Sequence, residues 1–166
     1  LFLLGYEAYK KIDKTTEKDL YFKNISYSSY IRLCENIIKS SKNVVLSYLD
    51  IDNFDRINYE KGPESADLIS LMLEKYIFEK FYNNAVYYKI SGENYIILFY
   101  DVPKLSVLTY LDKMVNLLKE SEPDLSLSIG IASSDGDYKN IFQLIYESKK
   151  ALNIAKKSGG GRIQSL

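Results

Sequence analysis

The side chains best suited to chemistry in this sequence are carboxylates, which gather in two short segments. Asp50 and Asp52 follow the apolar run 44–49, and Glu93 lies in the turn-like segment 91–94. Oxygen ligands without histidine or thiolate select a hard cation such as Mg²⁺ or Mn²⁺, and a site open on one side leaves room for substrate phosphates. Carboxylates joined by such a cation would suit phosphoryl or nucleotidyl transfer.

An ordinary role is also open for these carboxylates. An aspartate at a strand end and a glutamate in a turn are common solvated residues. Spacing alone therefore leaves two alternatives, a cation site and a set of surface residues without function.

Length and charge limit the class of protein. The chain has 166 residues, of which 46% are hydrophobic, and this suits one domain with a single core. It has 22 lysine and arginine residues and 22 aspartate and glutamate residues, so no net charge draws it to nucleic acid or anionic lipid. We therefore expect no nucleic-acid partner, and any binding must come from a local arrangement of side chains.

Histidine and disulfide chemistry are excluded. The sequence has no histidine and one cysteine, Cys34. A histidine general base, a His-ligated metal, a Cys/His zinc site and an internal disulfide are therefore ruled out. Cys34 lies in the apolar helical pattern of residues 30–38, where we expect a small buried core residue.

The segment boundaries follow from the pattern of apolar and polar residues. No apolar run reaches the roughly 18 residues that a membrane helix needs, and no signal-peptide pattern is present. We expect residues 1–25 to be a linker or short helix from an upstream domain, either a sensor or a membrane anchor, and residues 26–166 to form the domain proper. The expected location of this domain is the cytoplasm, with membrane anchoring of the whole protein left open.

Hydrophobic periodicity and turn residues predict a mixed α/β, or α+β, domain. Helices are expected over residues 30–38, after Gly62 and Pro63, from Pro103, and over residues 138–156. Strands are expected over residues 44–49, 85–90, 95–100 and 125–131, with the middle pair joined as a β-hairpin. Their order predicts a ferredoxin-like, palm-type βαββαβ sheet with packed helices.

This topology brings the two acidic segments together. A right-handed crossover leaves a gap between the first two strands, and the third strand fills it antiparallel to both. The hairpin tip at 91–94 then meets the end of the first strand. We therefore expect Asp50 and Glu93 to approach each other at a crevice on the strand edge.

Four segments, in order along the chain, also resemble the motifs of one family. They are DIDNF at residues 50–54 with Asn58 and Asp67 after it, SGENY at 91–95, LSIGIA at 127–132, and the terminal stretch 151–162. They resemble the DIDxF segment, the GG(D/E)EF signature hairpin, the SIG strand and the terminal AL..AK motif of the GGDEF, or diguanylate cyclase, family. The resemblance covers about residues 19–163.

The resemblance implies a domain that binds GTP and, in active members, forms a homodimer that makes cyclic di-GMP. It implies that Asp50, the Ile51 carbonyl and Glu93 hold Mg²⁺ or Mn²⁺, and that Glu93 is the catalytic base for the ribose hydroxyl. It further implies that Asn58 and Asp67 read the guanine edge, where an amide and a carboxylate can pair with the donors and acceptors of the base. Lys156 would hold a phosphate; without the resemblance it is an ordinary solvated lysine.

The sequence also departs from the family pattern. In the signature motif, which here consists of Ser91, Gly92, Glu93, Asn94 and Tyr95, a serine replaces the first glycine and an asparagine replaces the glutamate. Asp55 stands in place of a lysine, Gly160 in place of a phosphate-binding arginine, and Lys89 in place of an arginine. The product-inhibition motif would fall on Tyr82 and Ala85, and neither residue can serve.

These observations favour a degenerate GGDEF domain of a bacterial signalling protein that binds GTP and magnesium in a regulatory role. Two alternatives stay open. One is a weakly active diguanylate cyclase, since both carboxylates expected to bind the cation are present. The other is a purely structural dimerisation module with an empty crevice.

Overall fold

A five-stranded sheet in the order β2-β3-β1-β4-β5 forms the centre of the domain. The computed structural model describes residues 25–81, 84–134 and 139–166. The strands are β1 (Val44–Asp52), β2 (Ala85–Lys89), β3 (Asn94–Tyr100), β4 (Ser126–Ser134) and β5 (Ile163–Ser165). The helices are α3 (Tyr27–Ser40), α4 (Phe54–Lys61), α5 (Pro63–Phe81), α6 (Lys104–Ser121) and α7 (Ile141–Lys157).

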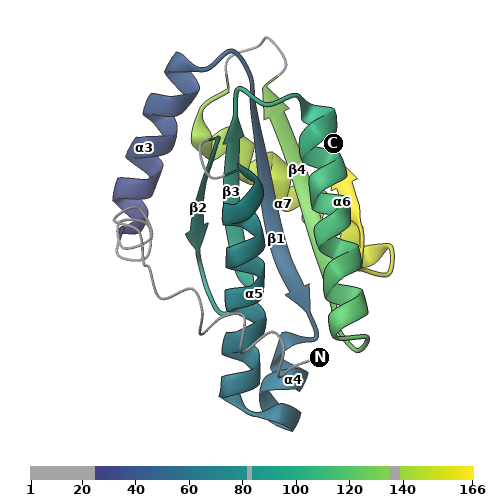
Figure 1. The fold of residues 1–166 in the computed structure, drawn as a ribbon. Coiled ribbons are helices and arrows are strands. Elements are labelled where there is room, and N and C mark those ends of the chain that lie inside the picture. The colour runs from purple at the N-terminus through teal and green to yellow at the C-terminus, as the bar shows by residue number, and fades with distance from the viewer. Residues whose placement is uncertain (1–24, 82–83, 135–138) are drawn as a thin grey trace.

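The strand order confirms the predicted topology. β3 lies between β1 and β2 and is antiparallel to both, while β4 pairs with the other edge of β1 (Figure 1). β5, which the sequence pattern did not reveal, extends the sheet parallel to β4. With only three residues, it is too short to show an alternating pattern.

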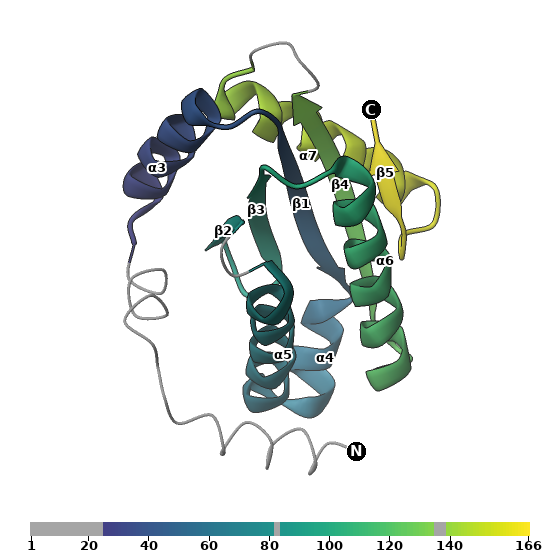
Figure 2. The same cartoon turned by 45° about the horizontal axis from the view of Figure 1, so that its top comes forward.

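Helices cover both faces of the sheet (Figure 2). Apolar residues of α5 and α6 pack with one face, around Val45, Leu49 and Phe99. Residues of α3 and α7 pack with the other face, around Leu46 and Leu98. The alternation of strand side chains between these two cores explains why the strands are nearly continuous apolar runs.

The first helix and its cysteine agree with the sequence-based prediction. Ser26 caps α3 by accepting a hydrogen bond from the main-chain nitrogen of Ser29. Cys34 is fully buried, and burial raises the pKa of its thiol to about 12. It is a core residue, as predicted.

Helix α4 was not predicted. It has eight residues, of which Phe54 and Ile57 are buried, so its apolar periodicity is weak. Its N-cap, Asn53, has a φ of 61° and makes no side-chain capping bond, so the usual start signal is also absent.

The start of α7 differs from the expected position. The helix begins at Ile141, because the side chain of Asn140 accepts a hydrogen bond from the main chain of Gln143 and so caps it there. Tyr138, the expected first residue, lies outside the described residues. Within the described part of the chain, no helix has the length and apolar character needed to cross a membrane.

A glycine lets α7 approach the sheet closely. A Cβ atom at Gly130 of β4 would overlap main-chain atoms of Ser148 and Leu152 in α7. Backbone atoms cannot move aside as a flexible side chain can, so this contact requires glycine.

We therefore predict that Gly130→Ala lowers the free energy of unfolding by about 3 kcal/mol or more, because the added methyl group forces α7 away from the sheet. Urea unfolding followed by circular dichroism measures the change. Asn153→Ala, at an exposed position of α7, is the control and should stay within about 0.5 kcal/mol of the wild type. Equal stabilities for the two variants would contradict the close packing at Gly130.

Candidate functional site

The hairpin tip and the end of β1 lie side by side. Asp50 of β1 is paired with Asn94 of β3, and the main-chain N–H of Ile51 donates to the carbonyl of Glu93 at 3.0 Å. The predicted approach of these two segments is therefore confirmed. The strand continues through Asp52, so Asp50 lies within β1 and does not follow it.

Asp50 and Glu93 line the same hollow, which has a volume of about 470 Å³. The hollow lies between the end of β1, the start of α4, the hairpin tip and the glycine-rich segment after α7. Its lining consists of Asp50, Ile51, Asp52, Asn53, Phe54, Asp55, Glu93, Ser126, Lys156, Gly159 and Gly160. Four of these side chains are carboxylates and one is a cation, so acidic groups dominate the site.

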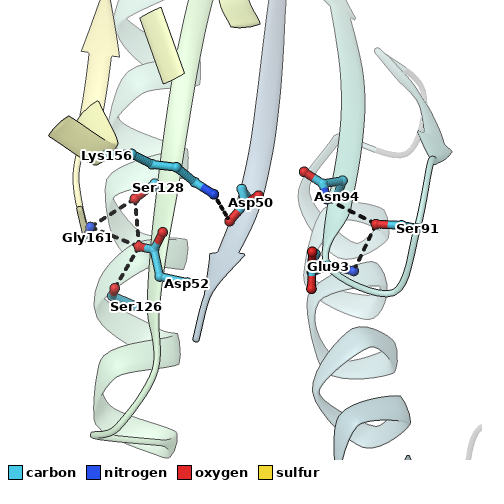
Figure 3. Close-up of polar contacts among 9 residues, drawn as sticks. All are labelled: Asp50, Asp52, Ser91, Glu93, Asn94, Ser126, Ser128, Lys156 and Gly161. Atoms are coloured by element: carbon cyan, nitrogen blue, oxygen red, sulfur yellow. Dashed lines mark hydrogen bonds and ion pairs between the residues drawn. The ribbon is translucent and has the colours of Figure 1, made fainter. Parts of the chain in front are cut away.

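The cation is Lys156, in the last turn of α7. Its Nζ atom lies 2.6 Å from Oδ1 of Asp50 (Figure 3). The structure thus brings together Asp50, Glu93 and Lys156 from three different parts of the chain. The ammonium group neutralises the charge of the buried carboxylate of Asp50.

Glu93 is affected by the excess of negative charge. Its partial burial, followed by the carboxylates of Asp55 and Asp50, raises the pKa of Glu93 above its ordinary value, and Lys156 partly opposes this. Carboxylates that repel one another favour either a bound proton or a bound cation.

The carboxylate of Asp52 is held by hydrogen bonds from neighbouring segments. Its Oδ2 atom accepts hydrogen bonds from Ser126 Oγ at 2.7 Å, Ser128 Oγ at 2.6 Å and the main-chain N–H of Gly161 at 3.1 Å (Figure 3). These bonds connect β1 to β4 and to the segment before β5. Asp52 therefore holds the wall of the hollow together, while Asp50, Asp55 and Glu93 are the other carboxylates of its lining.

The position of Gly160 restricts what could replace it. Gly160 has a φ of +71°, and a Cβ atom there would lie 3.0 Å from Oδ2 of Asp52. Arg162, two residues further on, lines an adjoining hollow of about 460 Å³ together with Lys119. The local backbone conformation and the nearby carboxylate of Asp52 therefore favour glycine at position 160.

Ser91 and Gly92 occupy the hairpin tip without backbone strain. Ser91 is not among the described residues with positive φ, and its Oγ accepts hydrogen bonds from Asn94 Nδ2 at 3.0 Å and from the main-chain N–H of Glu93 at 3.4 Å. The serine hydroxyl thus completes the turn. Gly92 has less freedom, because a Cβ atom there would lie 2.9 Å from the ring of Phe54.

Asn58 and Asp67 lie outside the lining of this hollow. Both are exposed, on helices α4 and α5, which pack against each other. Asp67 is close enough to Tyr95 for its charge to raise the pKa of that tyrosine. For the product-inhibition position, Ala85 begins β2, and Tyr82 lies outside the described residues.

The oxygen atoms that line the hollow are of the kind that a hard divalent cation binds. Within residues 25–81, 84–134 and 139–166, no three acidic or thiol side chains converge closely enough to hold a metal ion by themselves. Mg²⁺ usually binds through one or two carboxylates and completes its shell with water and substrate phosphates. Asp50, Glu93 and the Ile51 carbonyl fit that pattern. The ammonium group beside Asp50 is positively charged, as the metal ion would be.

A family model described as "Diguanylate cyclase, GGDEF domain" matches residues 19–162. The uncharacterized protein YtrP of Bacillus subtilis is 27% identical over 121 residues, which are 72% of this chain and 21% of that protein. The chain thus spans about a fifth of the length of this curated relative.

Solved structures share the fold. The GGDEF domain of DgcB from Caulobacter crescentus, in complex with c-di-GMP, has a TM-score of 0.72 and 17% identity, and the match covers 83% of this chain and 88% of that one. The active GGEEF domain of a diguanylate cyclase from Vibrio cholerae has a TM-score of 0.69 and 21% identity, with 82% and 89% covered. Together with the observed strand order, they confirm the predicted α+β fold class.

The two neighbouring aspartates should respond differently to mutation. We predict that Asp52→Ala lowers the free energy of unfolding by about 3 kcal/mol, because several hydrogen bonds to a charged acceptor are lost. Asp50→Ala removes one ion pair and leaves behind only the partly exposed Lys156, which water can solvate, so it should cost about 1 kcal/mol. Urea unfolding of both variants measures this, and an equal or reversed effect would contradict the structural role of Asp52.

Proposed function

Because this chain belongs to the diguanylate cyclase, GGDEF domain family, we propose that it binds GTP together with Mg²⁺ or Mn²⁺ in a regulatory role in bacterial cyclic di-GMP signalling, without efficient condensation of GTP. One observation carries the proposal. Asp50, Glu93 and Lys156 line one hollow, with Lys156 Nζ 2.6 Å from Asp50. In this proposal they supply two oxygen ligands for a divalent cation and one cation for a phosphate at the same place.

Each residue has a role in this proposal. Asp50, Glu93 and the Ile51 carbonyl would hold the divalent cation, which when bound neutralises charge on the triphosphate. Asn58 and Asp67, which are exposed on α4 and α5, would pair with the guanine edge. Lys156 neutralises Asp50 in the free domain and would turn to a phosphate when the divalent cation takes its place.

The charges around the hollow argue against efficient turnover. Asp55, where the family has a lysine, lies close enough to Glu93 for its charge to add to the effect of burial in raising the pKa of Glu93. Gly160, where the family has an arginine, contributes no side chain. A triphosphate in this hollow would therefore meet an added negative charge and would lack two cationic contacts, which weakens stabilisation of a transition state rich in negative charge.

A weakly active cyclase is the second candidate, because Asp50 and Glu93, the two carboxylates expected to bind the cation, both line the hollow. Two domains would have to face each other, so this activity requires a homodimer.

We predict that the domain binds a non-hydrolysable GTP analogue in the presence of Mn²⁺. Asp50→Ala and Glu93→Gln should each weaken binding at least tenfold, which corresponds to about 1.4 kcal/mol, because each removes a ligand of the cation. Isothermal calorimetry measures the affinity, and Glu120→Gln, at an exposed position of α6, is the matched control. Absence of heat with the wild type would reject nucleotide binding and leave the structural dimerisation module.

The positive charge that the family has at position 55 can be restored by mutation. We predict that Asp55→Lys tightens binding of the GTP analogue by about tenfold, because a like charge near the triphosphate becomes an opposite one. Gly160→Arg is unsuitable as a second reversal, because the left-handed backbone and the contact with Asp52 would strain any side chain there. No change in affinity would contradict the placement of Asp55 beside the phosphates.

Turnover separates the regulatory role from the weakly active cyclase. Incubation of the wild-type protein with GTP and Mn²⁺, followed by chromatography, should yield no cyclic di-GMP above background. Product that disappears in Glu93→Gln would contradict the regulatory proposal and support the cyclase.

A further inference from the structure

Three buried polar side chains in and beside the signature hairpin do not line the hollow. They are Ser70 and Glu74 of α5, which are 1% and 9% exposed, and Tyr95 of β3, which is fully buried. Figures 1 and 2 both show α5 beside β3. Burying hydroxyl and carboxyl groups costs free energy unless they are hydrogen-bonded, so their partners are informative.

These side chains form one network. The hydroxyl of Tyr95 donates to Oε1 of Glu74 at 3.3 Å, and Ser70 lies beside that hydroxyl, close enough to affect the pKa of Tyr95. Lys89 Nζ lies 3.5 Å from the same carboxylate and balances its charge. The family signature ends in phenylalanine where this chain has Tyr95, so the tyrosine hydroxyl in the network is an addition to that pattern.

The network reaches the main chain at the residue before Glu93. Ser70 Oγ donates to the carbonyl of Gly92 at 3.0 Å. From the opposite side, the N–H of Ile51 donates to the carbonyl of Glu93 at 3.0 Å. The ring of Phe54 packs against Gly92 so closely that it leaves no room for a Cβ atom. Two successive carbonyl groups at the hairpin tip are thus held by α5 and by β1.

Fixing these two carbonyls restricts the backbone from which the Glu93 side chain projects. We propose that Ser70, supported by Tyr95 and Glu74, is a positioning residue that holds the Gly92–Glu93 peptide so that the carboxylate of Glu93 faces the cation site. The proposal rests on the proposed function, because it requires that Glu93 binds a cation. Ser70 itself contacts neither the cation nor the nucleotide.

The arrangement has a consequence for the nucleotide. Asp67 precedes Ser70 by three residues, about one helical turn of α5. The same helix therefore carries the side chain proposed to bind guanine and the side chain that supports the cation ligand. A base held at Asp67 would stabilise the helix position that orients Glu93.

The test is a titration of Mn²⁺ in the presence of a saturating non-hydrolysable GTP analogue, followed by electron paramagnetic resonance. Ser70→Ala should weaken Mn²⁺ binding about three- to tenfold, the factor expected for one hydrogen bond. Its bound-Mn²⁺ spectrum should shift toward that of Glu93→Gln. Ser65→Ala is the matched control, because Ser65 lies on the same helix and its hydroxyl donates to the carbonyl of Lys61.

The outcomes distinguish this proposal from the proposed function. Wild-type affinity and spectrum in Ser70→Ala, with weakened binding in Glu93→Gln, would overturn the positioning role and leave the cation site in place. No binding by the wild type, or wild-type binding by Glu93→Gln, would overturn both.

Two further variants complete the experiment. Ser70→Cys is nearly isosteric but a weak donor, so it should reproduce the loss even if Ser70→Ala fails to fold, and wild-type binding by this variant would overturn the proposal. Tyr95→Phe keeps the bond from Ser70 to Gly92 and should give a smaller loss in the same direction. Wild-type binding by Tyr95→Phe would overturn the supporting role of Tyr95 and Glu74.

Discussion

The antiparallel register of β1 and β3 is the constraint on which the whole site depends. It sets Asp50 opposite Asn94 and lets Ile51 bond to the carbonyl of Glu93, so residues more than forty positions apart share one hollow. A slip of one residue would turn Asp50 to the opposite face of the sheet. The cores on both faces, which alternate along β1, hold the register in place.

The same register brings several carboxylates together, and neighbouring groups compensate part of their negative charge. Asp52 is compensated by two hydroxyl groups and one main-chain N–H, and Asp50 by the ammonium of Lys156. Partial burial of Glu93, together with its repulsion by Asp55 and Asp50, raises the pKa of Glu93. An acidic hollow with one lysine suits a divalent cation with a phosphate, but it offers little stabilisation to a reaction that develops more negative charge.

Sequence reasoning predicted the strand order, the hairpin and the meeting of Asp50 with Glu93, because these follow from apolar periodicity and the handedness of crossovers. It missed α4, whose few apolar residues and uncapped start give no periodic signal. It could not distinguish the structural role of Asp52 from the site role of Asp50, because the hydrogen-bond partners of Asp52 lie about 75 residues away in the sequence. The proposed role of Ser70 could not be predicted either, because its hydrogen-bond acceptor is a main-chain carbonyl that no sequence pattern marks.

Nuclear magnetic resonance of the protein with substoichiometric Mn²⁺ and a GTP analogue tests the central claim most directly, because the unpaired electrons broaden amide signals near the bound ion. The account predicts that amide signals of residues 50–52 and 92–94 broaden together, at the lowest Mn²⁺ concentrations. Broadening confined to one of these segments, or first at acidic residues elsewhere on the surface, would contradict a cation site shared by β1 and the hairpin tip.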